Sequence, residues 1–166
     1  PLAEVSPALI RAVPRSEDKR FHDHSGADWL AVGSAAGNLL SGGSRRGAST
    51  VSMQVAGMLD ESLDAPGGGR SFYQKMRQIR AARQLEDIWS KDQILEAYLN
   101  LVSFRGELQG IQSSSQGLFG KSPAGLTDVE AVVLAALIRS PQSNTGLVQK
   151  RACMLAHVLK LPVDCS

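Results

Sequence analysis

The segment SFYQKMRQIRAARQLEDIWSKDQILEAYLN, residues 71–100, predicts two consecutive helices and therefore a helical class of fold. Apolar residues recur in it every three or four positions, which is the period of a helix that buries one face. Ser90 and Gln93 have the spacing of a capping box, so the second helix is expected at about 91–100. The first helix, starting at Ser71, is expected to be the longest in the chain. Its predicted apolar stripe comprises Phe72, Met76, Ile79, Ala82, Leu85 and Trp89, while Lys75, Gln78 and Arg83 are expected to face elsewhere.

Helix start signals continue on both sides of this segment. Ser6 before Pro7 is typical of a helix N-terminus, and Pro14 is expected to end that helix at Val13. Asp28 can cap a further helix, which contains no charged residue. Few stretches alternate strictly between apolar and polar residues, so the sequence predicts an all-α domain.

The helices expected outside residues 71–100 cover residues 7–13, 29–40, 128–139 and 147–160. Gly42-Gly43 is expected to stop the second of these, while Thr127 with Glu130 forms a predicted capping box for the third. Residues 105–125 are rich in Gly, Ser and Gln, so they are expected to form a loop region with one short helix at most.

The composition limits the classes of protein to consider. With 166 residues and 43% hydrophobic content, the chain can form one domain with a core, so a single domain over residues 1–166 is expected. The net charge of +2 creates no general field for nucleic acid, and no stretch reaches the roughly 18 to 20 apolar residues of a membrane span. Because the chain opens at Pro1, we expect a trimmed or processed piece. Cys153 and Cys165 could form a disulfide, pack as core thiols or do neither.

Three short motifs suggest chemistry that the rest of the sequence does not support. The stretch GLFGKSP, residues 117–123, lacks the glycine that a phosphate-binding loop needs five residues before Gly120. The S-x-x-K pattern at residues 16–19 has no accompanying K-T-G element, which penicillin-binding transpeptidases require. His22 and His24 are too few for a zinc site, which needs three or four converging ligands. We therefore expect no metal site there and a structural hydrogen-bonding role for His24.

A run of ionisable residues, RSEDKRFHDHSGADW at residues 15–29, contains the adjacent carboxylates Glu17 and Asp18. Their surroundings could divide such a pair into one poised base and one fixed anion, but it could equally be a solvated surface pair. Residues 45–54, RRGASTVSMQ, offer hydroxyls and an amide that suit phosphate or sugar oxygens. Residues 70–83 contain five basic side chains and no acidic one, so this helix could face an anion or simply be solvated.

Five segments in order make a far more specific pattern: EDKRFHDHSGAD, GASTVSMQ, QKMRQIRAARQLEDIWSKDQILEAYLN, FRGELQGIQSSSQGLFGKSP and LTDVEAVVLAALIRSPQ. Together they resemble the glycosyltransferase family 51 domain, the peptidoglycan glycosyltransferase of class A penicillin-binding proteins, and most closely its C-type branch. The resemblance implies a lysozyme-like, mostly helical fold with a small membrane-facing jaw lobe. Any transmembrane anchor and transpeptidase domain would lie outside this chain. The uncharged residues 29–44 could then lie at a lipid interface or form a buried core helix.

Members of this family polymerise lipid II into β-1,4 glycan strands, with inversion at the donor anomeric carbon and release of undecaprenyl pyrophosphate. By its position in the motif, Glu17 corresponds to the general base. The resemblance also implies lipid II and the nascent glycan strand as partners, moenomycin-type inhibitors, no nucleic acid, and a place at the bacterial inner membrane on its periplasmic or extracytoplasmic side. The other matched positions are Gln78 as a second catalytic position, Asp18, Ser49, Thr50, Gln54 and Lys75 for substrate binding, and Phe21, His24 and Gly26 as scaffold.

The chain departs from this family at three positions. The second glutamate of the family falls on Gln78, an arginine falls on Gln74, and a basic residue falls on Gly57. A glutamine can donate a hydrogen bond to a phosphate oxygen, whereas a glutamate could act through a divalent cation such as magnesium or manganese; no other cofactor is implied. Three functions therefore stay open: an active glycosyltransferase, a degenerate domain that binds lipid II or glycan, and a lysozyme-like glycan-cleaving enzyme.

Overall fold

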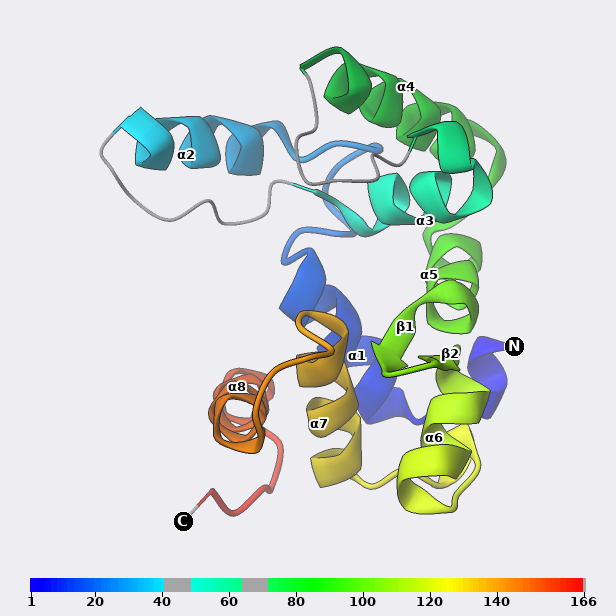
Figure 1. Ribbon diagram of the computed structural model, residues 1–166, viewed down its shortest axis with the longest axis vertical. Helices are drawn as coiled ribbons and strands as arrows, with labels where there is room; N and C mark the ends of the chain where they lie inside the picture. Colours follow the sequence, from blue (N-terminus) through cyan, green and yellow to red (C-terminus); the bar gives the residue numbers. More distant parts are fainter. Residues whose placement is uncertain (41–48, 64–71, 166) are drawn as a thin grey trace. The chain divides into compact units, whose positions relative to one another are not determined.

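The computed structural model describes residues 1–40, 49–63 and 72–165 (Figure 1). Within these residues the chain is mostly helical, with two short strands, which confirms the expected all-α class. The helices are α1 (Pro7–Glu17), α2 (Trp29–Leu40), α3 (Val51–Leu59), α4 (Phe72–Ile88), α5 (Lys91–Leu101), α6 (Ile111–Phe119), α7 (Asp128–Ile138) and α8 (Thr145–Leu159). The strands are β1 (Ser103–Arg105) and β2 (Leu108–Gln109), and short 3-10 helices lie at Leu2–Glu4, Glu61–Leu63 and Pro123–Gly125.

The chain divides into two compact units. Unit 1 combines Pro1–Lys19 with Leu95–Ser166, and unit 2 is the continuous segment Arg20–Ile94. Unit 2 is therefore inserted into the sequence of unit 1, and α5 begins in unit 2 and ends in unit 1. The single domain expected over residues 1–166 remains a prediction.

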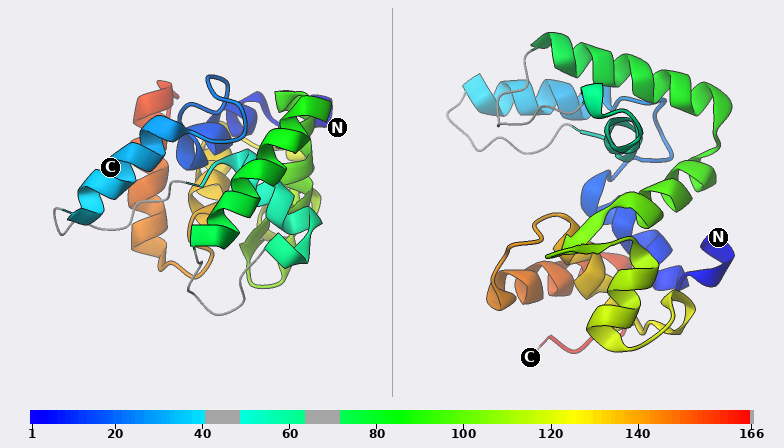
Figure 2. Two further views of the ribbon diagram at one scale, coloured as in Figure 1. Left: turned by 90° about the horizontal axis from the view of Figure 1, so that it is seen from above. Right: turned by 45° about the vertical axis from the view of Figure 1, so that its right-hand side comes forward.

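Helix α7 forms the core of unit 1, where it packs against α1 and α8 (Figures 1 and 2). From Ala131 to Ile138 all of its residues are buried except Val133, which is half-buried. A helix that is apolar on all sides must be covered on all sides, and each fully buried Leu or Val side chain contributes about 1.5–3 kcal/mol. The apolar run of α7 thus explains why both ends of the chain gather around it.

Helix α1 is longer than expected because it continues through Pro14 to Glu17. Proline removes one backbone hydrogen bond and usually ends or kinks a helix. Here Pro14 is buried, and its carbonyl accepts the N–H of Asp18 at 2.7 Å. Burial of this face against α7 outweighs the lost bond, so the expected end at Val13 is wrong.

Most other helix boundaries agree with their start signals. Helix α1 starts at Pro7 directly after Ser6, as expected. The expected side-chain caps are confirmed for Asp28 at α2, Ser90 with Gln93 at α5, and Thr127 with Glu130 at α7. Helix α8 begins two residues earlier than expected, because the Asn144 side chain caps it by accepting the Leu147 N–H at 2.9 Å. The helix stop at Gly42-Gly43, the helix start at Ser71 and the side chain of Phe72 lie outside the described residues.

Residues 105–125 contain more regular structure than expected. Strands β1 and β2 form an antiparallel hairpin, and α6 follows with nine residues. Gly110 joins the hairpin to the helix with a φ of +77°, and a Cβ atom there would lie 2.7 Å from the Asn100 carbonyl oxygen. The glycine content had indicated a loop, but Gly110 instead allows a close junction between strand β2 and helix α6.

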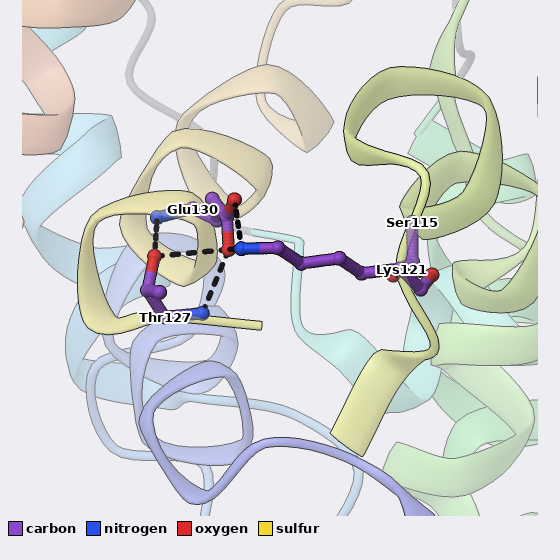
Figure 3. A network of polar contacts seen from close by, with 4 residues as sticks. All are labelled: Ser115, Lys121, Thr127 and Glu130. Carbon is purple, nitrogen blue, oxygen red and sulfur yellow. Dashed lines mark hydrogen bonds and ion pairs between the residues drawn. The ribbon is translucent and has the colours of Figure 1, made fainter. Parts of the chain in front are cut away.

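The GLFGKSP stretch has a structural role in unit 1 (Figure 3). Lys121 Nζ donates to both carboxylate oxygens of Glu130, at 2.7 and 3.0 Å. The same carboxylate accepts the N–H and the hydroxyl of Thr127 in the capping box of α7. On the other side, the Ser115 hydroxyl donates to the Lys121 carbonyl at 2.7 Å. Lys121 thus joins the loop after α6 to the first turn of α7.

Helices α3 and α4 pack against each other in unit 2 (Figures 1 and 2). Met53 of α3, Ile79 and Ala82 of α4, and Ala27 from the loop before α2 form a cluster in which each residue is at most 6% exposed. The predicted stripe of α4 is therefore correct at Ile79 and Ala82. It is wrong at Met76, which is 42% exposed, because α3 covers a narrower part of α4 than the periodicity suggested.

The two cysteines form a disulfide, one of the alternatives that the sequence left open. Cys153 in α8 is bonded to Cys165, with a Cα–Cα distance of 5.8 Å. The bond closes a short loop and ties the segment after α8 back to that helix, which stabilises the fold by about 3 kcal/mol. None of the described helices is long and apolar enough to span a bilayer.

Candidate active site

The acidic motif begins in unit 1, where α1 ends at Glu17. The Ser16 hydroxyl lies 3.2 Å from both Glu17 Oε1 and the Ala135 carbonyl oxygen, so it can donate to either. Arg139 Nη1 donates to the Ser16 carbonyl at 2.7 Å. Ala135 belongs to α7 and Arg139 is its C-cap, so the end of α1 is fixed to the core helix of unit 1. Glu17 is half-buried there, and Asp18 is 5% exposed.

The motif continues in unit 2, where its predicted scaffold residues form a closely held loop. The ring of Phe21 is buried. Gly26 has a φ of +70°, and a Cβ atom there would lie 2.7 Å from both Cγ and the backbone nitrogen of Arg83. Only glycine fits this position without displacing α4. The carbonyl of Gly26 also accepts the Thr50 hydroxyl at 2.6 Å, which ties the loop to the start of α3.

Asp28 ends this loop as a charged cap. Arg20 Nε donates to Asp28 Oδ2 at 3.0 Å, and the Ala31 N–H donates to Oδ1 at 2.9 Å. Burial raises the pKa of Asp28, but these two donors outweigh it and hold the pKa below its ordinary value of 3.8. Asp28 is therefore an ionised structural group and a poor candidate for a general base.

Two of the predicted substrate-binding residues meet in unit 2. Lys75 Nζ donates to Ser49 Oγ at 2.8 Å and lies 3.4 Å from Met53 Sδ. Lys75 comes from α4 and Ser49 directly precedes the N-cap of α3, so helix packing joins positions 26 residues apart. A hydroxyl oxygen that accepts this bond can still donate its own hydrogen. The pair can therefore present a positive charge and a hydroxyl hydrogen-bond donor to an anion.

Thr50 and Gln54, the other two predicted binding residues in this segment, belong to α3. Thr50 is the N-cap of the helix, and its hydroxyl accepts the Met53 N–H at 3.2 Å while donating to Gly26. Thr50 is 2% exposed, so its hydroxyl is occupied by these hydrogen bonds within the protein. Gln54 lies in the first turns of α3 and is half-buried. Of the segment 45–54, residues 45–48 lie outside the described residues.

Gln78 is buried, so the expectation that it faces away from the packed side of α4 is wrong. It is 3% exposed, and its Nε2 donates to the Leu63 carbonyl at 2.9 Å, which satisfies the donor side of the buried amide. Among the described residues its Oε1 has no hydrogen-bond partner. A Cβ atom on Gly57 would lie 3.6 Å from Gln78 Nε2, so two of the three departures from the family adjoin each other. Gln74, the third, is half-buried on the same helix.

Sequence reasoning missed Lys91. Its Nζ donates to Glu86 Oε1 at 2.7 Å and to the His24 carbonyl at 2.8 Å, and it lies 4.6 Å from the centre of the Phe21 ring. A signal was present, because Lys91 occupies the first position of α5, where the helix dipole disfavours a cation. A lysine at such an unfavourable position indicates that its ammonium group interacts with groups outside its own helix.

The described residues contain no group of three or more His, Cys, Asp or Glu side chains that could hold a metal ion.

The sequence comparisons identify the class of protein to which this helical fold belongs. A family model described as Transglycosylase matches residues 1–160. The match spans nearly the whole chain, so the chain belongs to the transglycosylase family. This confirms the expected family and its enzyme class, peptidoglycan glycosyltransferase.

Curated relatives include both short and long proteins. The biosynthetic peptidoglycan transglycosylase of Agrobacterium fabrum is 34% identical over 164 residues, which cover 92% of this chain and 70% of that protein. Penicillin-binding protein 1C of Escherichia coli is 42% identical over 141 residues, which cover 84% of this chain and 18% of that protein. The similar transglycosylase of Marinomonas sp. is 40% identical, with 80% of this chain and 57% of that protein covered. This chain thus spans between about half and 70% of the shorter relatives.

Proposed function

We propose that this domain polymerises lipid II into β-1,4 glycan strands, with inversion at the donor anomeric carbon and release of undecaprenyl pyrophosphate. The observation that carries the proposal is the contact between Lys75 and Ser49, 2.8 Å apart in unit 2 of a chain that belongs to the transglycosylase family. A pyrophosphate leaving group takes negative charge away, so its departure requires fixed cations and hydrogen-bond donors. Lys75 and Ser49 supply both at one place.

Glu17 is the proposed general base. The acceptor sugar loses the proton of its 4-hydroxyl as that oxygen attacks the donor anomeric carbon, and a half-buried carboxylate can accept the proton. Ser16 and the core helix α7 hold the end of α1, which fixes where this carboxylate lies within unit 1. Asp18 follows as a buried second carboxylate, proposed to contact the substrate.

The remaining binding residues divide by their contacts. Gln54 is proposed to contact the donor together with Ser49 and Lys75. Thr50 contributes by capping α3 and holding the Gly26 loop beside that helix. Gln78 takes a neutral role one turn after Lys75, supporting α4 through its bond to Leu63. No step requires a divalent cation, although magnesium or manganese could bridge phosphate oxygens at this place.

The departures from the family also support an active domain. The family pattern has a basic residue at the position of Gly57 and a glutamate at that of Gln78, and in this chain the two positions adjoin. Relative to the family pattern, this chain therefore lacks both a positive charge at Gly57 and a negative charge at Gln78. Because both are absent, neither position holds a buried charge without its counter-charge. A domain that had simply decayed would be expected to lose such residues independently. A hydrolase would have no need for the Lys75–Ser49 pair, because it releases no pyrophosphate.

The proposed setting is the cell envelope, on the extracytoplasmic side of the inner membrane, with the nascent glycan strand as a second partner. Helix α2 supports a lipid contact because it contains no charged residue, and its first residues Trp29 and Leu30 are 54% and 70% exposed. For the start of the segment 29–44, these exposures favour a position at a lipid interface over a buried core helix.

The proposal is tested by lipid II consumption in the full-length protein. Glu17→Gln should lower turnover by about 10² to 10⁴-fold, the usual loss for a general base. Glu107→Gln is the matched control, since Glu107 is an exposed carboxylate in unit 1. Near-normal turnover in Glu17→Gln would remove this residue from the mechanism. Cleavage of finished glycan by the wild type would favour the hydrolase instead.

The anion site is tested by binding of lipid II and of moenomycin. Lys75→Ala should weaken both, whereas Arg80→Ala, an exposed cation on the same helix, should change neither appreciably. Arg83 is unsuitable as a control because it packs against Gly26. Equal losses in the two variants would mean that α4 acts only as a diffuse positive field.

A further inference from the structure

A largely buried ionic cluster in unit 2 joins four separate segments through Lys91. Lys91 Nζ donates to Glu86 Oε1 at 2.7 Å, at the end of α4, and to the His24 carbonyl at 2.8 Å, in the motif loop. The same Glu86 oxygen accepts the hydroxyl of Ser52, which is fully buried in α3. The cluster thus links the motif loop, α3, α4 and the first residue of α5.

The ammonium group of Lys91 matches its surroundings in both geometry and charge. An ammonium has three donors in different directions, and here it meets a carboxylate, a backbone carbonyl and the face of the Phe21 ring at 4.6 Å. Its side chain is 22% exposed and that of Glu86 is 9% exposed, so both charges are largely withdrawn from water. A planar guanidinium could not reproduce these three directions.

The His24 carbonyl and the Phe21 ring are the contacts that give the cluster a role beyond stability. Both belong to the loop that follows Glu17 and Asp18 in the acidic motif, and both are scaffold positions of that motif. The rest of the cluster belongs to helices α3 and α4. Ser49 and Thr50 directly precede α3, and Lys75 lies on α4. Lys91 therefore connects the acidic motif with the anion-binding residues through one charged group.

We propose that Lys91 is a positioning residue, which holds the motif loop of residues 20–28 in its catalytic conformation through the His24 carbonyl and the Phe21 ring. The inference rests on the proposed glycosyl transfer, because this loop directly follows the segment carrying Glu17 in the acidic motif. It predicts that loss of Lys91 lowers the chemical rate more than it weakens donor binding, because Lys75 and Ser49 keep their own contact.

The experiment uses the double variant Lys91→Met with Glu86→Gln in the full-length protein. Removing Lys91 alone would leave the Glu86 carboxylate buried without its cation, whereas the neutral glutamine can still accept the Ser52 hydroxyl. Three quantities are measured: the thermal midpoint, kcat and KM for lipid II, and the amide hydrogen exchange of residues 20–28. Lys121→Met is the matched control, because Lys121 also donates to a glutamate at 2.7 Å but belongs to unit 1.

We expect the double variant to keep a thermal midpoint near that of the wild type. Its kcat should fall at least tenfold with KM changed less than about threefold, and exchange in residues 20–28 should accelerate at least tenfold while α3 and α4 keep their protection. Lys121→Met should leave kcat and the exchange of this loop unchanged.

Two results would overturn the inference: unchanged exchange in residues 20–28, or a normal kcat in the double variant. A wild type that does not consume lipid II would instead contradict the proposed function. In that case the exchange measurement still decides whether Lys91 holds the loop, because it requires no turnover.

Discussion

Two lysine–glutamate pairs with the same 2.7 Å distance lie in the two units of this chain, and they differ in what they connect. In unit 1, Lys121 and Glu130 are nine residues apart, and within the part of the chain that the structure describes their network adds Thr127 and Ser115 (Figure 3). Their side chains are 40% and 17% exposed. In unit 2, the Lys91–Glu86 pair is more buried, at 22% and 9%.

The partners of Lys91 and Glu86 come from distant parts of the sequence. Ser52 is 34 residues from Glu86, and His24 is 67 residues from Lys91. A pair that water already solvates gains little from its Coulomb attraction, whereas a buried pair that satisfies separate segments becomes costly to break. The distance between the charged atoms therefore says little about the role of an ion pair. The role of an ion pair depends instead on how buried the pair is and on how far apart in the sequence the segments that it joins lie.

The largest effect is expected from Lys91→Met. This change leaves the Glu86 carboxylate buried without its cation and should lower the free energy of unfolding by about 3 kcal/mol. Denaturant unfolding measures the loss, and adding Glu86→Gln should recover a large part of it. A loss below about 1 kcal/mol would mean that the two pairs are energetically alike, which would remove the contrast between the units.

Lys121→Met should have a smaller effect. Because this pair is local and partly exposed, its loss should lower the free energy of unfolding by about 0.5–1 kcal/mol, and added salt should reduce the difference from the wild type. The capping box of Thr127 and Glu130 stays intact in this variant. A loss as large as that of Lys91→Met would show that the loop after α6 depends on Lys121 far more than its exposure suggests.

The smallest expected effect is a pH dependence in unit 1. Hydrogen bonds from Lys121 and from the Thr127 N–H hold the pKa of Glu130 below its ordinary value of 4.5. A carboxyl whose pKa is lowered by folding contributes stability above its ordinary pKa, and that contribution is lost as the pH falls toward the folded value. The stability difference between wild type and Lys121→Met should therefore shrink as the pH falls below about 4.5. If the stability difference does not change with pH, Lys121 stabilises the protein through the packing of its side chain and not through its charge.

Local sequence signals predicted the helices of this chain well. Capping residues such as Thr127 with Glu130 act within one turn, so they can be recognised from the sequence. The continuation of α1 through Pro14 could not be predicted, because it depends on burial against α7, more than 100 residues away. The burial of Gln78 was missed for the same reason: the carbonyl that accepts its hydrogen bond belongs to Leu63, outside its helix.

The candidate site followed from the resemblance of the motifs and not from the spacing of residues. No local rule joins Ser49 to Lys75, because only the packing of α3 on α4 brings them together. Lys91 is the instructive omission. Its place at the positive end of α5 was readable, but its partners at His24 and Phe21 depend on tertiary structure.

The insertion of unit 2 into unit 1 has a consequence for protein synthesis. The Ser16 hydroxyl and its acceptor, the Ala135 carbonyl, are 119 residues apart, which corresponds to roughly 6 to 24 s at the usual pace of the ribosome. During this interval α1 has emerged without α7, while the continuous unit 2 can already close. The apolar face of α1 therefore stays uncovered until α7 is made, and proteolysis of nascent chains stalled before residue 128 should cut α1 before it cuts α3 or α4.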